Sequence, residues 1–168
     1  MAMSSELEQA FNDQITLEFS SEYVYLQMGA FFEDRDLPGF AQWMRLQAAE
    51  ERAHALKFFD FLLDMGNVVR LGAIEAPRPS FDSTVEVFEA SLAHEKRVTA
   101  SIHDLYGRCS AAGEFHALPL LHWFIDEQVE EEAGVSQIVQ QLKMAGDNGA
   151  ALLFLDRELG ARTPVAEG

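Results

Sequence analysis

The chain has 168 residues, of which 48% are hydrophobic and 24% are charged, a composition typical of one soluble globular domain and unlike that of a disordered chain. Its 28 acidic and 12 basic residues give a formal net charge of -16 at pH 7, which argues against direct nucleic-acid binding and favours cations as partners. No stretch suits a membrane helix or a secretory signal, and the single cysteine, Cys109, excludes an intrachain disulfide, so we expect a cytoplasmic protein with no membrane partner.

Helical periodicity, together with helix-capping and helix-breaking residues, predicts four long helices and a short fifth one. Ser5 and Glu8 suggest a capping box at the first helix, Pro38 suits the first turn of the second, and Ser83 with Glu86 suggests a capping box at the third. The expected helices span about 5–33, 38–66, 82–112, 115–145 and 150–159, with a polar tail over 160–168, all within a single domain over 1–168.

The connections predict how these helices lie. Short links after Glu33 and near Gly113 favour two antiparallel hairpins. The connection over 67–81 is long enough to run beside a helix of about 45 Å, at roughly 3.3 Å per residue. Two hairpins joined by one long crossover make an all-α four-helix bundle.

The apolar stripe of each long helix is interrupted near its middle by polar residues. These are Glu18 and Glu22 on the first helix, Gln47, Glu51 and His54 on the second, Glu95 on the third, and Gln128 and Glu131 on the fourth. Counting from the two hairpin turns places them at similar heights. Carboxylates facing one another in a core are costly unless a cation or a paired charge compensates them.

Glu51 and His54 are three residues apart and share a helix face, so both can reach one metal ion. Carboxylates with one imidazole suit iron or manganese better than an ion that prefers thiolates, and zinc could occupy the site without turning over. Such a pair alone is a weak signal. Its strength comes from Glu18, Glu95 and Glu131, which share the same level of the core.

The sequence resembles the non-heme bacterial ferritins over about residues 5–159. The matching pieces are the run 12–18 followed by Tyr25, the segment 50–54, the pair His94 and Glu95, and the run from Trp123 through 126–132. The resemblance implies a ferritin-like bundle with one long crossover loop and a short fifth helix. It also implies iron storage and detoxification in a homo-oligomeric cage of 24 subunits, where Fe(II) is oxidised by dioxygen or hydrogen peroxide and kept as a ferric mineral.

The resemblance also assigns roles to residues. It implies that the first iron binds Glu18, Glu51 and His54, that the second binds Glu51, Glu95 and Glu131 with Gln128 beside it, and that a third site consists of Glu50, Glu127 and Glu130. Tyr25 would either support the metal ligands from beside them or act as an electron donor, and Tyr25, Glu51 and His54 are the expected catalytic residues of a ferroxidase.

Some residues separate this chain from related families. Arg52 stands where bacterioferritins carry their heme-ligating methionine, so no heme is expected. Glu22 departs from the ferritin pattern and is either an extra metal ligand or a residue that faces water, of which the second is favoured. His94, which points about 100° away from Glu95, is not expected to bind metal, and Trp123 is expected in the core.

Two other classes of function remain open from the residues themselves. A metal-free interaction bundle would need internal counter-charges, whereas Arg45, Arg52, Lys57 and Arg97 all fall off the core stripes. A substrate-oxidising di-iron enzyme would need an apolar pocket beside the metals and a reductase partner.

Overall fold

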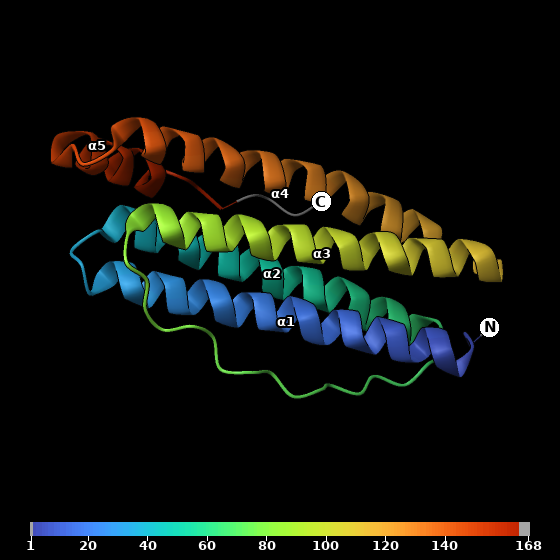
Figure 1. Ribbon diagram of the computed structural model, residues 1–168. Helices are drawn as coiled ribbons and strands as arrows, with labels where there is room; N and C mark the ends of the chain where they lie inside the picture. Colours follow the sequence, from blue (N-terminus) through green and yellow to red (C-terminus); the bar gives the residue numbers. More distant parts are fainter. Residues whose placement is uncertain (1, 165–168) are drawn as a thin grey trace.

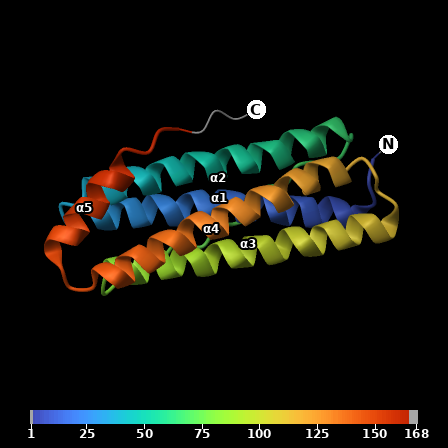
Figure 2. The same cartoon turned by 90° about the horizontal axis from the view of Figure 1, so that it is seen from above.

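The computed structural model describes residues 2–164 and has five helices within them. They are α1 Ser5–Glu33, α2 Pro38–Asp64, α3 Thr84–Ala112, α4 Leu118–Ala145 and α5 Gly149–Gly160. Figure 1 shows α1 antiparallel to α2 and α3 antiparallel to α4, with the green crossover running the length of the bundle beside α1. In Figure 2, α5 lies at the end of the bundle where α2 begins. The prediction of an all-α bundle with one long crossover and a short fifth helix is confirmed.

The start of α1 differs from the predicted capping box by one residue. Ser4, not Ser5, is the N-cap, and its side chain accepts a hydrogen bond from the backbone N–H of Leu7. Glu8 does not close a box but accepts a hydrogen bond from the side chain of Asn67 at 2.7 Å. Glu8 therefore ties the crossover to α1.

Two other helix limits lie inside the expected ranges. The second helix ends at Asp64, and Gly66 turns the chain with a φ of 77°. The fourth helix begins at Leu118, because the backbone before it forms a tight turn in which the N–H of Ala117 bonds to the carbonyl of Glu114. At α3 the predicted Ser83 cap is present.

Polar side chains of α1 fasten the crossover to the bundle. The side chain of Asn12 donates to the carbonyl of Val68 and accepts from the backbone N–H of Arg70, at 2.9 and 2.5 Å. Thr16 accepts from the backbone N–H of Gly72 at 3.0 Å. These bonds satisfy backbone N–H and C=O groups of the crossover, which form no regular helix or sheet hydrogen bonds.

The buried core consists of two apolar clusters with a polar layer between them. One cluster, which includes Phe32, Phe40 and Phe88, lies toward α5, and the other includes Phe11 and Phe58. Along α1, Ile15 belongs to one cluster and Tyr25 to the other, while the fully buried Glu18 and Ser21 stand between. The polar layer is therefore enclosed by hydrophobic packing on both sides. None of the described helices is long and apolar enough to cross a membrane.

Candidate metal centre

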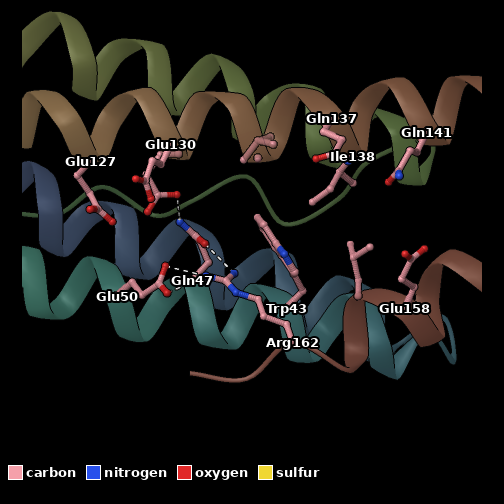
Figure 3. Close-up of a pocket in the computed structure, with 14 residues that line it drawn as sticks. Trp43, Gln47, Glu50, Glu127, Glu130, Gln137, Ile138, Gln141, Glu158 and Arg162 are labelled. Atoms are coloured by element: carbon pink, nitrogen blue, oxygen red, sulfur yellow. Dashed lines mark hydrogen bonds and ion pairs between the residues drawn. The ribbon is translucent and has the colours of Figure 1, made fainter. Parts of the chain in front are cut away.

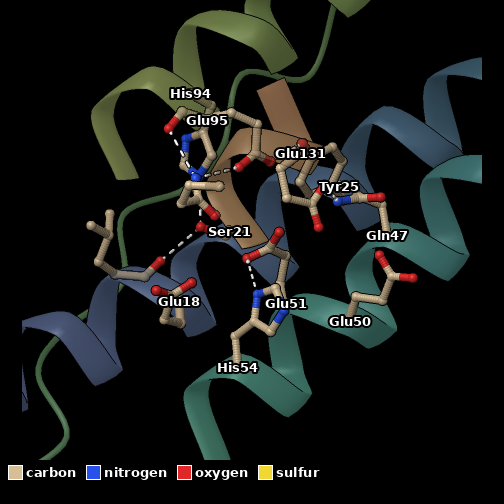
Figure 4. Close-up of polar contacts among 12 residues, drawn as sticks. Glu18, Ser21, Tyr25, Gln47, Glu50, Glu51, His54, His94, Glu95 and Glu131 are labelled. Carbon is tan, nitrogen blue, oxygen red and sulfur yellow. Dashed lines mark hydrogen bonds and ion pairs between the residues drawn. The ribbon is translucent and has the colours of Figure 1, made fainter. Parts of the chain in front are cut away.

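One half of the polar layer brings together Glu18 of α1 with Glu51 and His54 of α2 (Figure 4). One possible ligand atom from each of the three residues lies within 4.8 Å of the others. All three side chains are buried, and Nδ1 of His54 is 3.6 Å from a carboxylate oxygen of Glu51. The spacing of three residues on α2 places both of its side chains on the same face.

Two carboxylate oxygens in this group have no hydrogen-bond partner among the described residues. They are Oε2 of Glu18 and Oε1 of Glu51, both shielded from solvent. The other oxygen of Glu18 accepts a hydrogen bond from Gln14 at 2.7 Å. A buried carboxylate oxygen without a partner is costly, and a divalent cation would compensate it. The donor set, oxygen with one imidazole, fits an iron ion.

The other half of the layer contributes Glu95 of α3 and Glu131 of α4. Glu95 accepts hydrogen bonds from the hydroxyl of Tyr25 and from the amide of Gln128, the latter at 3.2 Å. Glu131 accepts a hydrogen bond from the amide of Gln47 at 2.5 Å. These neutral donors hold both carboxylates in place without neutralising them.

Burial raises the pKa of the four carboxyl groups, and their mutual repulsion adds to the effect for three of them. Burial followed by the charge of Glu51 raises the pKa of Glu18, and burial followed by the charges of Glu95 and Glu131 raises the pKa of Glu51. The pKa of Glu95 is raised by burial, and that of Glu131 is raised to about 8 by burial and by Glu95. Without a cation, Glu131 therefore holds its proton near neutral pH, and the other three carboxyl groups ionise less readily than exposed glutamates.

The three carboxylates expected at a third site line one groove, as Figure 3 shows. Glu131 lines the same groove. Glu50 of α2 faces Glu127 and Glu130 of α4 there. Glu127 also has a carboxylate oxygen within 4.8 Å of ligand atoms of His54 and Glu131. The groove is therefore continuous with the buried polar layer.

Comparison with known proteins agrees with this geometry. Residues 8–145 match the family model of the ferritin-like domain. The chain belongs to the ferritin family. It is 36% identical to a probable bacterial non-heme ferritin-like protein of Haemophilus influenzae over 158 residues, which cover 94% of this chain and 96% of the relative. It is 37% identical to a bacterial non-heme ferritin of Staphylococcus saprophyticus, with 96% of each chain covered.

Solved structures show the same likeness. A ferritin of Archaeoglobus fulgidus engineered into a closed form superimposes on this ferritin with a TM-score of 0.96 at 41% identity. The match covers 98% of this chain and 100% of the other. The open-pore form of that archaeal ferritin gives a TM-score of 0.95 at the same identity, over 97% of this chain and 100% of the other.

In this ferritin, two polar residues near the layer are engaged elsewhere. Glu22 lies 3.9 Å from Arg52 and its side chain is 20% exposed. His94 is buried, with one ring nitrogen 2.6 Å from the hydroxyl of Ser21 and the other 2.9 Å from Arg97. Burial and the neighbouring guanidinium lower the pKa of His94 to about 4. Both residues therefore have partners outside the carboxylate cluster.

Trp123 lies at the surface, so its expected place in the core was wrong. It is 36% exposed because α4 turns this position toward the edge of the bundle. One side of its ring packs against His54, with the centroids 5.6 Å apart, and Lys57 lies 4.6 Å from the ring centroid. The tryptophan thus covers the outer side of the histidine.

Sequence reasoning missed two residues that hold the carboxylates. Gln14 lies one turn before Glu18, and its carbonyl oxygen accepts a hydrogen bond from Ser101 of α3 at 2.6 Å. The spacing of four residues was a usable signal. Arg162, in the predicted polar tail, contacts Gln47 and Glu50. Nothing in the local sequence indicates this, because its position depends on how α5 packs.

Proposed function

We propose that this ferritin stores and detoxifies iron. It oxidises Fe(II) to Fe(III) at a dinuclear site within each subunit and keeps the product as a ferric mineral inside a homo-oligomeric cage of 24 subunits. Family membership supports the coarse function. The observation that supports the chemistry is the pair of unpartnered, buried carboxylate oxygens on Glu18 and Glu51 beside His54.

The chain's residues divide the work of binding. Glu18, Glu51 and His54 would hold one Fe(II), while Glu51, Glu95 and Glu131 would hold the other, with Gln128 positioning Glu95. Oxygen-rich ligands stabilise Fe(III) more than Fe(II), so they favour the loss of one electron from each iron to dioxygen or hydrogen peroxide. Because burial raises the pKa of these carboxyl groups, binding the ions also releases protons.

The position of Tyr25 supports a role at this site. Its buried hydroxyl donates a hydrogen bond to Glu95 and lies 2.9 Å from Ser91. Burial and the charge of Glu95 raise its pKa well above the usual value, so the phenol keeps its proton. We propose that Tyr25 orients Glu95 and, when it donates an electron during oxidation, passes its hydroxyl proton to Glu95 along their hydrogen bond.

The metal-free interaction bundle is disfavoured by the positions of the basic residues. Arg45 pairs with Glu33, Arg52 approaches Glu22, and Lys57 lies over the ring of Trp123. Within residues 2–164, no arginine or lysine is paired with Glu18 or Glu51. Protonation or a cation from solution must therefore neutralise these groups.

The test is stopped-flow absorbance after adding two Fe(II) per subunit to the aerobic apoprotein, beside size-exclusion chromatography. We expect fast oxidation by a large assembly. Glu51→Ala should abolish the fast phase and leave assembly intact, because it removes the bridging ligand and relieves buried repulsion.

Glu22→Ala is the matched control, since it removes a carboxylate one turn from Glu18 that lies near Arg52. It should oxidise iron like the wild type. Fast oxidation that survives Glu51→Ala would remove the basis of the assignment, and slow oxidation by a small wild-type species would favour the metal-free bundle.

A further inference from the structure

The groove beside the proposed dinuclear site contains a positively charged side chain of the protein, Arg162. The groove has a volume of about 470 Å³ and lies between α2, α4 and the end of α5 (Figure 3). Five glutamates line it: Glu50, Glu127, Glu130, Glu131 and Glu158. Arg162 is the only basic residue in this lining, all of which lies in the described part of the chain.

Arg162 is held in the groove by several contacts. One guanidinium nitrogen, Nη2, donates to both carboxylate oxygens of Glu50, at 2.7 and 2.8 Å. The other, Nη1, donates to the side-chain carbonyl oxygen of Gln47 at 2.9 Å. The guanidinium carbon lies 5.0 Å from the ring centroid of Trp43. The turn after α5 fixes the backbone, since the N–H of Arg162 bonds to the carbonyl of Leu159.

The contact with Gln47 extends to a proposed iron ligand. Because the carbonyl oxygen of Gln47 accepts from Arg162, the amide nitrogen of Gln47 faces Glu131 and donates to it at 2.5 Å. Arg162, Gln47 and Glu131 therefore form one chain of hydrogen bonds from the end of α5 to the polar layer. The chain is shielded, since the side chains of Arg162 and Glu50 are only 21% and 15% exposed.

We propose that Arg162 is an internal competitor for cations in this groove. A divalent ion that binds Glu50 with Glu127 or Glu130 competes with the guanidinium, because Nη2 already contacts both oxygens of Glu50. Arginine cannot yield by losing a proton, so the two positive charges would repel. Arg162 thus weakens the third site relative to the buried pair and sets the order in which the sites fill. This inference rests on the proposed function.

Zinc binding to the assembled apoprotein tests the proposal without turnover. In isothermal titration calorimetry, the wild type should bind two Zn²⁺ per subunit tightly and a third more weakly. Arg162→Gln should tighten the third event about tenfold, as expected for removing a charge-assisted contact from the same carboxylate. Arg162→Lys keeps the positive charge but loses the planar guanidinium group. Its affinity for the third Zn²⁺ should lie between those of the wild type and Arg162→Gln.

Two further variants separate competition from a general charge effect. Arg157→Gln removes the same charge from exposed α5 surface and should titrate like the wild type. Glu50→Gln combined with Arg162→Gln should lose the gain, because the freed carboxylate is then absent. A third event that is unchanged or weaker in Arg162→Gln, with the first two normal, would overturn the proposal.

Fluorescence gives a structural readout. In a Trp123→Phe background, Trp43 is the only tryptophan, and the third Zn²⁺ should change its emission as Arg162 leaves the ring. The change should be absent when Arg162 is already glutamine. An unchanged emission in the wild-type groove would show that the guanidinium stays in place. Failure of the wild type to bind the first two ions would count instead against the proposed dinuclear site.

Discussion

At the scale of residues, the polar layer holds more acid than its own donors can satisfy. Gln14, Gln128 and Gln47 each donate one hydrogen bond to the carboxylate of Glu18, Glu95 and Glu131 respectively. Glutamine orients a carboxylate without adding charge, so the negative potential of the cluster remains available to an incoming cation. An arginine in the same position would have neutralised it.

The raised carboxyl pKa values predict how the stability of the apoprotein depends on pH. Because the folded-state pKa of Glu131 is about 8 against 4.5 when exposed, the folded state binds more protons between these values. The contribution to stability is present below about pH 4.5 and is lost as pH rises through 8. We expect the Tm of the metal-free protein to fall by several degrees from pH 5 to 8, at roughly 2–4 °C per kcal/mol.

Thermal unfolding of variants in chelator isolates this effect. Glu131→Gln cannot deprotonate, so its Tm should fall less steeply with pH than that of the wild type. Glu130→Gln changes an exposed neighbour on the same helix and should keep the wild-type slope. Parallel slopes for Glu131→Gln and the wild type would contradict the assigned role of Glu131.

At the scale of elements, α5 is fastened to α2 at a point where two backbones touch. A Cβ on Gly39 would lie 1.7 Å from the carbonyl oxygen of Asp156, and one on Gly160 would lie 2.8 Å from the Cα of Gly39. The side chain of Asp156 also accepts a hydrogen bond from the backbone N–H of Phe40 at 2.9 Å. This close approach positions the turn that carries Arg162.

Gly39→Ala should therefore displace α5, because the neighbouring atoms are backbone and cannot rotate away. We expect a protease to cleave peptide bonds within α5 faster than in the wild type, and we expect a lower Tm. Gly134→Ala is the control, since its Cβ would meet nothing within 4 Å and alanine suits a helix interior better by roughly 0.5–1 kcal/mol. Equal stability of Gly39→Ala and the wild type would show that α5 is not held by this contact.

The helices were predictable from the sequence because each carries a periodic apolar stripe. The limits of the helices were less predictable. Ser4 and Ser5 are the same residue type, and only the backbone conformation decides which one caps α1. The carboxylates on the apolar stripes could be found from the sequence, because burying a charge is costly and a glutamate at a core position therefore indicates a special role. Arg162 could not, because its partners lie more than one hundred residues away and meet it only after α5 packs.

At the scale of the whole molecule, apolar side chains remain exposed beside the crossover. Tyr23 of α1 is 53% exposed and Leu71 is 60% exposed, and both line a groove of about 220 Å³ with Phe19 and Ile74. Exposed apolar grooves of this kind mark contact surfaces. In a homo-oligomer, we expect another copy of the chain to cover this one.

Leu71→Glu should then reduce the assembly to smaller species, because it places a charge in a contact that would exclude water. Multi-angle light scattering after size-exclusion chromatography gives the mass, and circular dichroism should report unchanged helix content, since Leu71 lies outside the helices. Leu71→Met keeps an apolar side chain of similar volume and should assemble normally. If Leu71→Glu formed the wild-type assembly, the groove beside the crossover would not be a subunit contact, and the exposed apolar residues elsewhere on the bundle would have to provide it.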